Sequence, residues 1–149
     1  MDIRVVRFAG LTAGEVYDVA RLRQDVFVVE QECPYLDLDG RDRDPGTGHV
    51  LMHDEGGALL GYARVLDDTT AWRIGRVVLA RPARGRGLAD GVIRAAIGHC
   101  RREDPLRDVV LDAQTPLADW YAGFGFAVDG DEFLEDGIPH TPMRLSSKR

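Results

Sequence analysis

The clearest indication of the fold is the stretch Arg84-Gly85-Arg86-Gly87-Leu88-Ala89. A mostly apolar, strand-like run at residues 76–80 precedes it, and a segment with helical spacing of apolar residues follows from Leu88. Where a strand turns through glycines into a helix, the first-turn N–H groups lack an intrahelical partner and carry partial positive charge. Such a turn binds phosphate, and arginine side chains add full positive charges around the amides. The sequence therefore predicts a pyrophosphate-binding turn at residues 84–89.

Two familiar phosphate-binding motifs have a different spacing. The nucleotide P-loop requires lysine followed by serine or threonine after its last glycine, where this chain has Leu88-Ala89. The dinucleotide fingerprint requires a third glycine at the position of Asp90, and an acidic residue after a later strand, which is missing here. Neither motif describes this turn.

A third pattern fits the turn, which reads Arg84-x-x-Gly87-x-Ala89 directly after an apolar strand. A second segment, residues 117–126, reads Leu-Ala-Asp-Trp-Tyr-Ala-Gly-Phe-Gly-Phe. The two segments resemble the Arg/Gln-x-x-Gly-x-Gly/Ala signature and the "FYxxxGF" region of the GNAT superfamily of N-acetyltransferases. Residues 26–35, 37–42 and 135–140 are similar to the ElaA-like subgroup of that superfamily. The resemblance covers nearly the whole chain.

The order of the expected elements predicts an α/β (α+β) fold. We expect a GNAT-like mixed, mostly antiparallel sheet of six to seven strands, with helices on both faces. The capping-box pattern Thr12-x-x-Glu15 starts a helix that runs to about Val28. Further helices are expected after the phosphate-binding turn and after Thr115-Pro116, and an acidic connection is expected at residues 129–140. Strands are expected at residues 3–8, 49–53, 58–66, 72–80, 108–113, 126–128 and 141–145.

Length and composition indicate one ordinary globular domain over residues 1–149, with 44% hydrophobic and 30% charged residues. The net charge of −6 argues against nucleic acid as a partner. No apolar run is long enough to span a membrane, and the first residues lack the core of a signal peptide. Two cysteines are too few for a disulfide framework. We therefore expect a cytoplasmic protein without a membrane partner, and by analogy with the family a homodimer is plausible.

The resemblance implies acetyl-CoA as the donor and direct transfer to an amine, without an acyl-enzyme. The turn would bind the diphosphate of the coenzyme. The preceding strand would offer backbone N–H and C=O groups to the pantetheine, as an added strand does. Whether the Arg86 side chain contacts phosphate or points to solvent is left open. The expected coenzyme-binding residues are Val77, Val78, Leu79, Arg84, Gly85, Arg86, Gly87, Leu88 and Ala89.

Tyr121 is the expected general acid, because the family pattern places this tyrosine beside the coenzyme sulfur. A phenol can protonate a thiolate as it leaves. The alternative is an aromatic side chain that only packs with its neighbours Trp120, Phe124 and Phe126.

The general base is less evident, since the strand at residues 73–79 carries no glutamate, unlike that of many superfamily members. His140 is the first candidate, because histidine exchanges a proton near neutral pH. The alternative is a polar residue that closes a loop. His49, Glu30, Asp39 and a chain of water molecules are further candidates. His53 and His99 are expected on the surface.

The acidic loop Asp37-x-Asp39-x-x-Asp42-x-Asp44 lacks the glutamate that an EF-hand calcium site requires, so we expect no metal. Its carboxylates are suited to attract a cationic acceptor, and the alternative is a solvated charged face. Asp39 and Asp42 are therefore candidate acceptor-binding residues, with Gln31 and Tyr35 added on resemblance.

Two functions stay open for the chain. The first is an acetyltransferase that acts on a small-molecule or protein amine. The second is a catalytically silent acyl-CoA-binding module. Cys33 lacks the spacing of a catalytic cysteine, and Cys100 belongs to an apolar helix face and is expected in the core.

Overall fold

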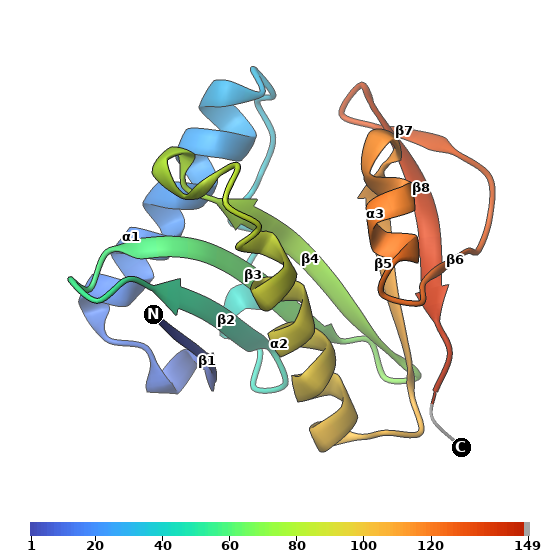
Figure 1. The fold of residues 1–149 in the computed structure, drawn as a ribbon, viewed down its shortest axis with the longest axis horizontal. Coiled ribbons are helices and arrows are strands. Elements are labelled where there is room, and N and C mark those ends of the chain that lie inside the picture. The colour runs from blue at the N-terminus through green and yellow to red at the C-terminus, as the bar shows by residue number, and fades with distance from the viewer. Residues whose placement is uncertain (148–149) are drawn as a thin grey trace.

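The computed structural model describes residues 1–147, and these residues form one eight-stranded sheet. Its strands are β1 (Asp2–Arg7), β2 (Gly48–His53), β3 (Leu59–Asp67), β4 (Ala71–Leu79), β5 (Asp108–Gln114), β6 (Ala127–Val128), β7 (Phe133–Glu135) and β8 (Ile138–Leu145). The order is β1-β2-β3-β4-β5-β8-β6, and β7 also pairs with β8. Only β4 and β5 pair in parallel among the described strands (Figure 1). The predicted mixed, mostly antiparallel sheet is confirmed.

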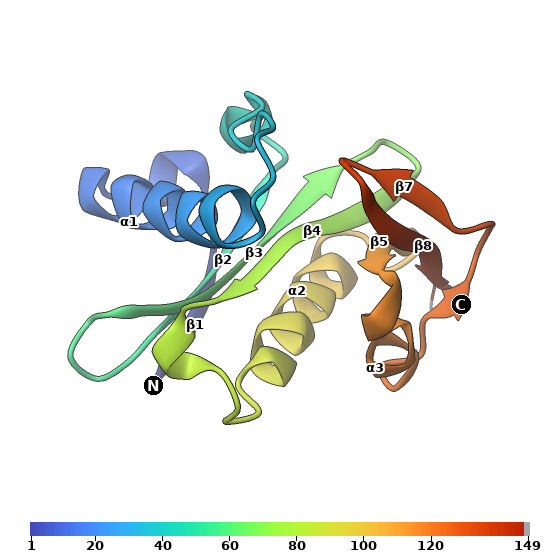
Figure 2. The same ribbon diagram turned by 90° about the horizontal axis from the view of Figure 1, so that it is seen from above.

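Helices cover both faces of the sheet, as predicted. Figure 2 shows α1 (Ala13–Arg23) on one face and α2 (Ala89–Glu103) with α3 (Ala118–Ala122) on the other. The Thr12 hydroxyl accepts a hydrogen bond from the Glu15 N–H at 3.1 Å, and the Glu15 carboxylate accepts one from the Thr12 N–H at 2.9 Å. This capping box starts α1 where the sequence predicts it. The helix then continues as a π-helical segment, Gln24–Glu30, so it extends slightly beyond the predicted end.

The core lies on both sides of the sheet. On one side, Val92, Ile93, Ala96 and Cys100 of α2 are fully buried against the central strands, which confirms Cys100 as a core residue. On the other side, apolar residues of α1 and the π-helical segment pack on Leu51, Tyr62 and Val78. Burying each large apolar side chain contributes about 1.5–3 kcal/mol. No helix in the described part of the chain is long and apolar enough to cross a membrane.

Two predictions about single elements were wrong. The sheet has more strands than expected, because β7 lies within the stretch read as an acidic connection. β7 and β8 are joined by Asp136 and Gly137, both with positive φ, which is the geometry of a tight hairpin turn. His99 was expected on the surface, but it is 6% exposed and packs against the ring of Trp72. The buried face of α2 is wide enough to include it.

Candidate active site

The central feature of the site is the separation of β4 from β5. The two strands pair only where residues 71–73 face residues 108–110, and beyond that point they diverge (Figure 1). On its other side, β4 contains one residue more than β3 opposite it, because Tyr62 faces Val78 while Arg64 faces Gly75. Such a bulge bends the strand and increases its twist. Beyond Arg73, the backbone of β4 has no residue of β5 paired with it.

A cavity of about 790 Å³ opens where the strands diverge. It is lined by β4, β5, α3, β8, the π-helical segment and the loop that follows that segment. The predicted site residues that line it, the candidate base Glu30 included, are Glu30, Gln31, Tyr35, Asp39, Val77, Val78, Leu79, Arg84, Tyr121 and His140. The cavity thus brings together residues from five separate stretches of the sequence.

The phosphate-binding turn continues from Arg84 to the start of α2. Gly85 and Gly87 have φ of +75° and +71°, the left-handed conformation that glycine adopts without strain. A Cβ at either position would meet nothing within 4 Å, so the backbone conformation, and not crowding, requires glycine here. Leu88, the residue before α2, provides no side-chain acceptor for the first-turn N–H groups. A left-handed glycine turn that leads into a helix without a side-chain cap fits a bound diphosphate.

Arg84 is held in place by an acidic side chain. Its Nη1 and Nη2 donate to Glu30 Oε2 and Oε1 at 2.9 and 3.1 Å, and its Nε donates to the Leu79 carbonyl at 3.3 Å. Arg81 Nε donates to Glu30 Oε1 at 3.2 Å. The hydrogen bonds from Arg84 lower the pKa of Glu30, so this carboxylate is ionised at neutral pH.

Tyr121 lies on α3 and is buried at the cavity wall. Its ring contacts Trp120 and Phe126 edge-on, with centroid separations of 4.8 and 6.1 Å. Burial raises the pKa of Tyr121 to about 12. The phenol therefore keeps its proton at neutral pH and is available as a proton donor.

His140 lies on β8, and its ring is oriented by the β7–β8 hairpin. Its Nδ1 lies 2.7 Å from the carbonyl oxygen of Ile138, so Nδ1 carries the proton and donates it to that oxygen. The ring stacks on Phe133 at 5.8 Å, and Nε2 is 3.9 Å from Glu135 Oε2. In the neutral imidazole, Nε2 is therefore the nitrogen that can accept a proton.

The acidic loop is bound to α1 and to the sheet by three arginines. We call this cluster the arginine–aspartate network, and it consists of Arg23, Arg64, Arg76, Asp37, Asp39 and Asp42. Arg23 is 1% exposed and donates to Asp37 at 2.9 Å and to Asp42 at 2.6 Å. The network contains three positive and three negative charges, so the three arginines balance the charges of the three aspartates.

Asp39 and Asp42 hold different places in this network. Arg64 donates two hydrogen bonds to Asp39, at 2.8 and 2.6 Å, and these hold the pKa of Asp39 far below its usual value. Asp39 nevertheless lines the cavity. The Asp42 carboxylate accepts from Arg23 and Arg64 and is not among the residues that line the cavity. These contacts favour a structural role for Asp42.

Arg76 ties the network to the bulge of β4. It has a φ of +53°, an unusual conformation for a residue other than glycine, and such strain is common at functional sites. Its Nε lies 2.8 Å from Asp37 Oδ1, and its guanidinium lies over the Tyr35 ring at 5.5 Å. The Tyr35 hydroxyl donates to Asp37 Oδ1 at 2.7 Å. The loop and the bulge therefore hold each other in position.

His49 lies away from the cavity. It is 1% exposed, its Nδ1 is 2.6 Å from the Tyr62 hydroxyl, and its Nε2 is 2.8 Å from the Asp42 carbonyl oxygen. Burial lowers its pKa. With both ring nitrogens engaged, His49 is a structural residue of the core.

Sequence analysis missed several residues of the site, notably Arg64 and Arg76, and also Asp112, Gln114 and Glu135, which line the cavity. For Arg64 a signal exists, because a charged residue interrupts the apolar run at residues 59–66. Arginine is rarely fully buried without a partner, so its position predicts a paired carboxylate. Nothing in the local sequence indicates which carboxylate it meets.

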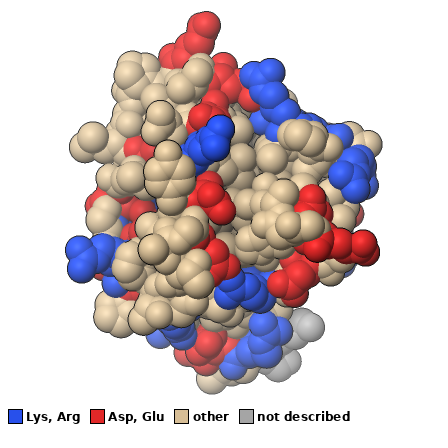
Figure 3. Space-filling view, turned by 90° about the vertical axis from the view of Figure 1, so that its left-hand side faces the viewer, with Lys and Arg blue, Asp and Glu red and all other residues tan. Residues whose placement is uncertain are grey.

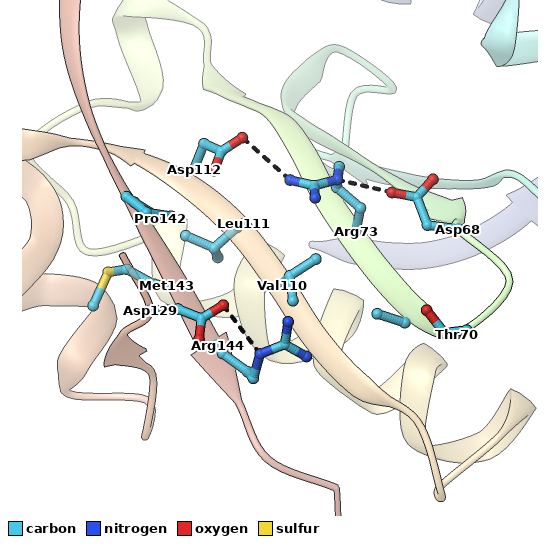
Figure 4. Close-up of a pocket in the computed structure, with 11 residues that line it drawn as sticks. Asp68, Thr70, Arg73, Val110, Leu111, Asp112, Asp129, Pro142, Met143 and Arg144 are labelled. Atoms are coloured by element: carbon cyan, nitrogen blue, oxygen red, sulfur yellow. Dashed lines mark hydrogen bonds and ion pairs between the residues drawn. The ribbon is translucent and has the colours of Figure 1, made fainter. Parts of the chain in front are cut away.

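A smaller hollow of about 290 Å³ adjoins the cavity on the open face of β4, β5 and β8. Arg73 lies between Asp68 and Asp112, at 2.8 and 3.1 Å, and Arg144 bonds Asp129 at 3.1 Å (Figure 4). The Arg73–Asp112 bond joins β4 to β5 at the point where they separate. It therefore adds a side-chain contact between the two strands beside the last residue pair of their ladder.

The molecular surface at the left of Figure 1 carries acidic and basic side chains side by side, without a continuous basic area (Figure 3). Among residues 1–147 there is no group of three or more His, Cys, Asp or Glu side chains that could hold a metal ion. Cys33 is buried at the cavity wall, with Sγ 3.7 Å from the Asp136 carbonyl oxygen.

Comparisons with known proteins agree with this architecture. The family model described as an acetyltransferase (GNAT) domain matches residues 30–147. The chain is 38% identical to protein ElaA of Escherichia coli over 138 residues, 89% of this chain and 88% of that protein. It is 41% identical over 145 residues to a UPF0039 protein of Mycobacterium tuberculosis, with 95% and 90% covered.

Two crystal structures are similar over almost their whole length. One, an acyl-CoA N-acyltransferase from Pseudomonas aeruginosa, is 38% identical with a TM-score of 0.92, covering 98% of this chain and 100% of that one. The other, Escherichia coli ElaA, has a TM-score of 0.93 with the same coverage, and over this longer shared stretch the identity is 32%.

Proposed function

Because the chain belongs to the GNAT acetyltransferase family, we propose that it moves an acetyl group directly from acetyl-CoA to an amine. One observation carries the proposal. The phosphate-binding turn begins at Arg84, and this residue lines the same cavity as Tyr121 and His140. An anion site, a proton donor and a proton acceptor around one cavity are the groups that acyl transfer to an amine requires.

The donor side of the cavity is the phosphate-binding turn together with the unpaired edge of β4. Residues 84–89 would hold the diphosphate through main-chain amides, with Arg84 adding charge. Val77, Val78 and Leu79 would bind the pantetheine through backbone groups that β5 leaves free. When bound, the coenzyme supplies a thioester as the activated acyl group. A backbone N–H of this edge is suited to stabilise negative charge on the thioester oxygen.

Proton transfer is assigned to two side chains. His140 Nε2 accepts a proton from the acceptor ammonium, because Nδ1 is committed to the Ile138 carbonyl. Tyr121 donates its proton to the sulfur as the thiolate leaves, because its raised pKa keeps it protonated until then. The freed amine attacks the thioester carbonyl, and after the carbon–sulfur bond breaks the Tyr121 phenolate takes the second proton that the new amide nitrogen loses. No covalent acyl-enzyme forms.

The acceptor is proposed to be a small-molecule or protein amine. Gln31, Tyr35 and Asp39 line the acceptor side of the cavity, and Asp39 is ionised there. Arg64 offsets the charge of Asp39, so we propose that its carboxylate oxygens hold the acceptor amine by accepting hydrogen bonds from it. We propose that residues 1–149 act as a single catalytic domain. Both cysteines are buried and unpaired, in agreement with a reducing compartment such as the cytoplasm.

The test combines binding and turnover. Calorimetry measures whether the purified protein binds acetyl-CoA, and a thiol reagent measures free CoA released across a panel of amines and peptides. We expect binding, and acceptor-dependent thiol release with at least one amine. Binding without turnover on any acceptor would instead favour a silent acyl-CoA-binding module. No binding of acetyl-CoA would contradict both.

A further inference from the structure

Glu30 forms an ion pair with Arg84, the arginine at the start of the phosphate-binding turn. Its two carboxylate oxygens accept from Nη1 and Nη2 of Arg84 in a paired, bidentate arrangement, at 2.9 and 3.1 Å. Arg81 adds a third hydrogen bond at 3.2 Å. The remaining Arg84 nitrogen, Nε, donates to the Leu79 carbonyl. Every nitrogen of the Arg84 guanidinium therefore already has an acceptor from the protein.

The contact joins two parts of the chain that are distant in sequence. Glu30 is the last residue of the π-helical segment, and Arg84 lies 54 positions later at the start of the turn. Both side chains line the cavity, and 29% of the Glu30 side chain is exposed. A carboxylate and a phosphate group form the same bidentate geometry with arginine. Glu30 thus occupies the position that a phosphate oxygen pair would take.

We propose that Glu30 is an internal anion that competes with the coenzyme diphosphate for Arg84, and so weakens coenzyme binding. This rests on the proposed function, in which residues 84–89 bind the diphosphate. A diphosphate carries more charge and more acceptor oxygens than a carboxylate, so it displaces Glu30 from the guanidinium. The displaced carboxylate stays close to the bound anion and repels it. Both effects lower the affinity for substrate and product coenzyme alike and speed product release.

The competition makes a prediction about ligand class. Ligands that carry the diphosphate must displace Glu30, whereas a pantetheine thioester without the nucleotide does not reach Arg84. Removal of the Glu30 charge should therefore strengthen the binding of CoA and leave the binding of pantetheine unchanged. The effect should also depend on Arg84, because without this arginine there is no shared partner.

The experiment measures the Kd of CoA by calorimetry for the parent protein and for Glu30→Gln. Asp25→Asn is the matched control, because Asp25 lies on the same segment, its side chain is 60% exposed and pairs with Arg21, and it does not line the cavity. Glu30→Gln should lower the Kd of CoA about two- to fivefold, the range that exposed ion pairs produce. Asp25→Asn should not change it. In the Arg84→Gln variant, adding Glu30→Gln should lower the Kd of CoA by less, because it then removes only the repulsion between the Glu30 carboxylate and the diphosphate.

The outcomes separate the two proposals. An unchanged or higher Kd for Glu30→Gln, in a parent that binds CoA, would overturn the competition and make Glu30 a residue that positions Arg84. A gain of the same size with pantetheine would also overturn it, since the diphosphate would then play no part. If the parent itself does not bind CoA, the proposed function fails first. Circular dichroism of each variant confirms that the fold is retained.

Discussion

At the scale of single residues, Tyr121 is the most direct test of the chemistry. Tyr121→Phe removes the proton donor but keeps the aromatic ring that packs on Trp120 and Phe126. We expect kcat to fall about 100-fold or more, the usual contribution of a general acid. The Kd of acetyl-CoA should be unchanged, because the hydroxyl does not bind the diphosphate. A loss of affinity of the same size as the loss in kcat would assign Tyr121 to binding instead.

The pH profile gives a second reading of the same residue. Because burial raises the pKa of Tyr121 to about 12, the phenol is protonated throughout the range from pH 6 to pH 10. Loss of the donor occurs only as the pH rises toward that value. Between pH 8 and pH 10, ionisation of Tyr121 should therefore not lower the rate of the parent. The parent and Tyr121→Phe should show the same pH dependence over this range. Initial rates at saturating substrates over this range are the measurement.

Asp37 is the residue on which the loop depends most. It is 6% exposed and accepts from Arg23, while its other oxygen faces Arg76 and the Tyr35 hydroxyl. Asp37→Asn leaves the buried Arg23 without a full counter-charge, and we expect the free energy of unfolding to fall by about 3 kcal/mol. Denaturant unfolding measures it.

Asp44→Asn is the control for that change. The Asp44 side chain is 55% exposed and lies 3.6 Å from Arg41, so its removal should change stability by less than about 0.5 kcal/mol. Equal losses for the two variants would show that burial of the pair is unimportant.

The acidic loop shows where residue-level prediction stops. The pattern of aspartates predicts either a surface that attracts a cationic acceptor or a solvated charged face, and it does not predict the ion pairs with Arg23, Arg64 and Arg76. These arginines come from α1, β3 and β4, so their meeting depends on tertiary structure. Local sequence shows that the loop is acidic but cannot show that its counter-charges arrive from three other elements.

At the scale of elements, the turn before α2 depends on its left-handed glycines. Gly87→Ala places a side chain at a φ of +71° and should destabilise that conformation by about 1 kcal/mol. Because the turn amides would shift, we expect the Kd of acetyl-CoA to rise about tenfold, equal to about 1.4 kcal/mol. Calorimetry measures the affinity.

Gly57→Ala is the matched control, since Gly57 has a φ of +88° in the turn between β2 and β3 and equally open surroundings. It should show a similar loss of stability with no change in affinity. If both variants bind acetyl-CoA equally well, the turn is not the phosphate site.

Elements with strong local signals were predicted well. The capping box, the helix after the glycine turn and seven of the strands lie within a few residues of their expected places. β7 was missed although Asp136-Gly137 is a typical hairpin turn, because the strand has only three residues, all of them exposed, and so shows no alternation of buried and exposed positions. The bulge at Arg76 has no local signature either. It follows from the pairing of β4 with β3 and from the contacts of Arg76 with the loop.

At the scale of the whole molecule, the paired carboxylates predict how stability depends on pH. Hydrogen bonds from Arg64 lower the pKa of Asp39, and at Asp42 the bonds and charges of Arg23 and Arg64 outweigh the opposing effect of burial. A carboxyl group whose pKa is lower in the folded state than in the unfolded state stabilises the fold at a pH above the unfolded-state pKa. This stabilisation is lost as the pH falls through the folded-state pKa. The parent should therefore lose stability below about pH 4.

Urea unfolding followed by circular dichroism between pH 7 and pH 3 measures this loss. An Asp39→Asn, Asp42→Asn double variant should be less stable at neutral pH and should lose less on acidification. A parent whose stability is flat down to pH 3 would contradict the ion pairing of the network.

The short pairing between β4 and β5 has a mechanical consequence for the whole protein. Strands β1–β4 form one half of the sheet and β5–β8 the other, and only three residue pairs join the two halves. A ligand that binds between the two strands would form hydrogen bonds to the backbone groups that β4 and β5 leave unpaired there. Amide hydrogens on the inner edge of residues 77–79 should then exchange more slowly with deuterium, and so should those at the facing end of β5. The ligand-bound protein would then be more rigid than the free protein, because the ligand joins the two halves of the sheet.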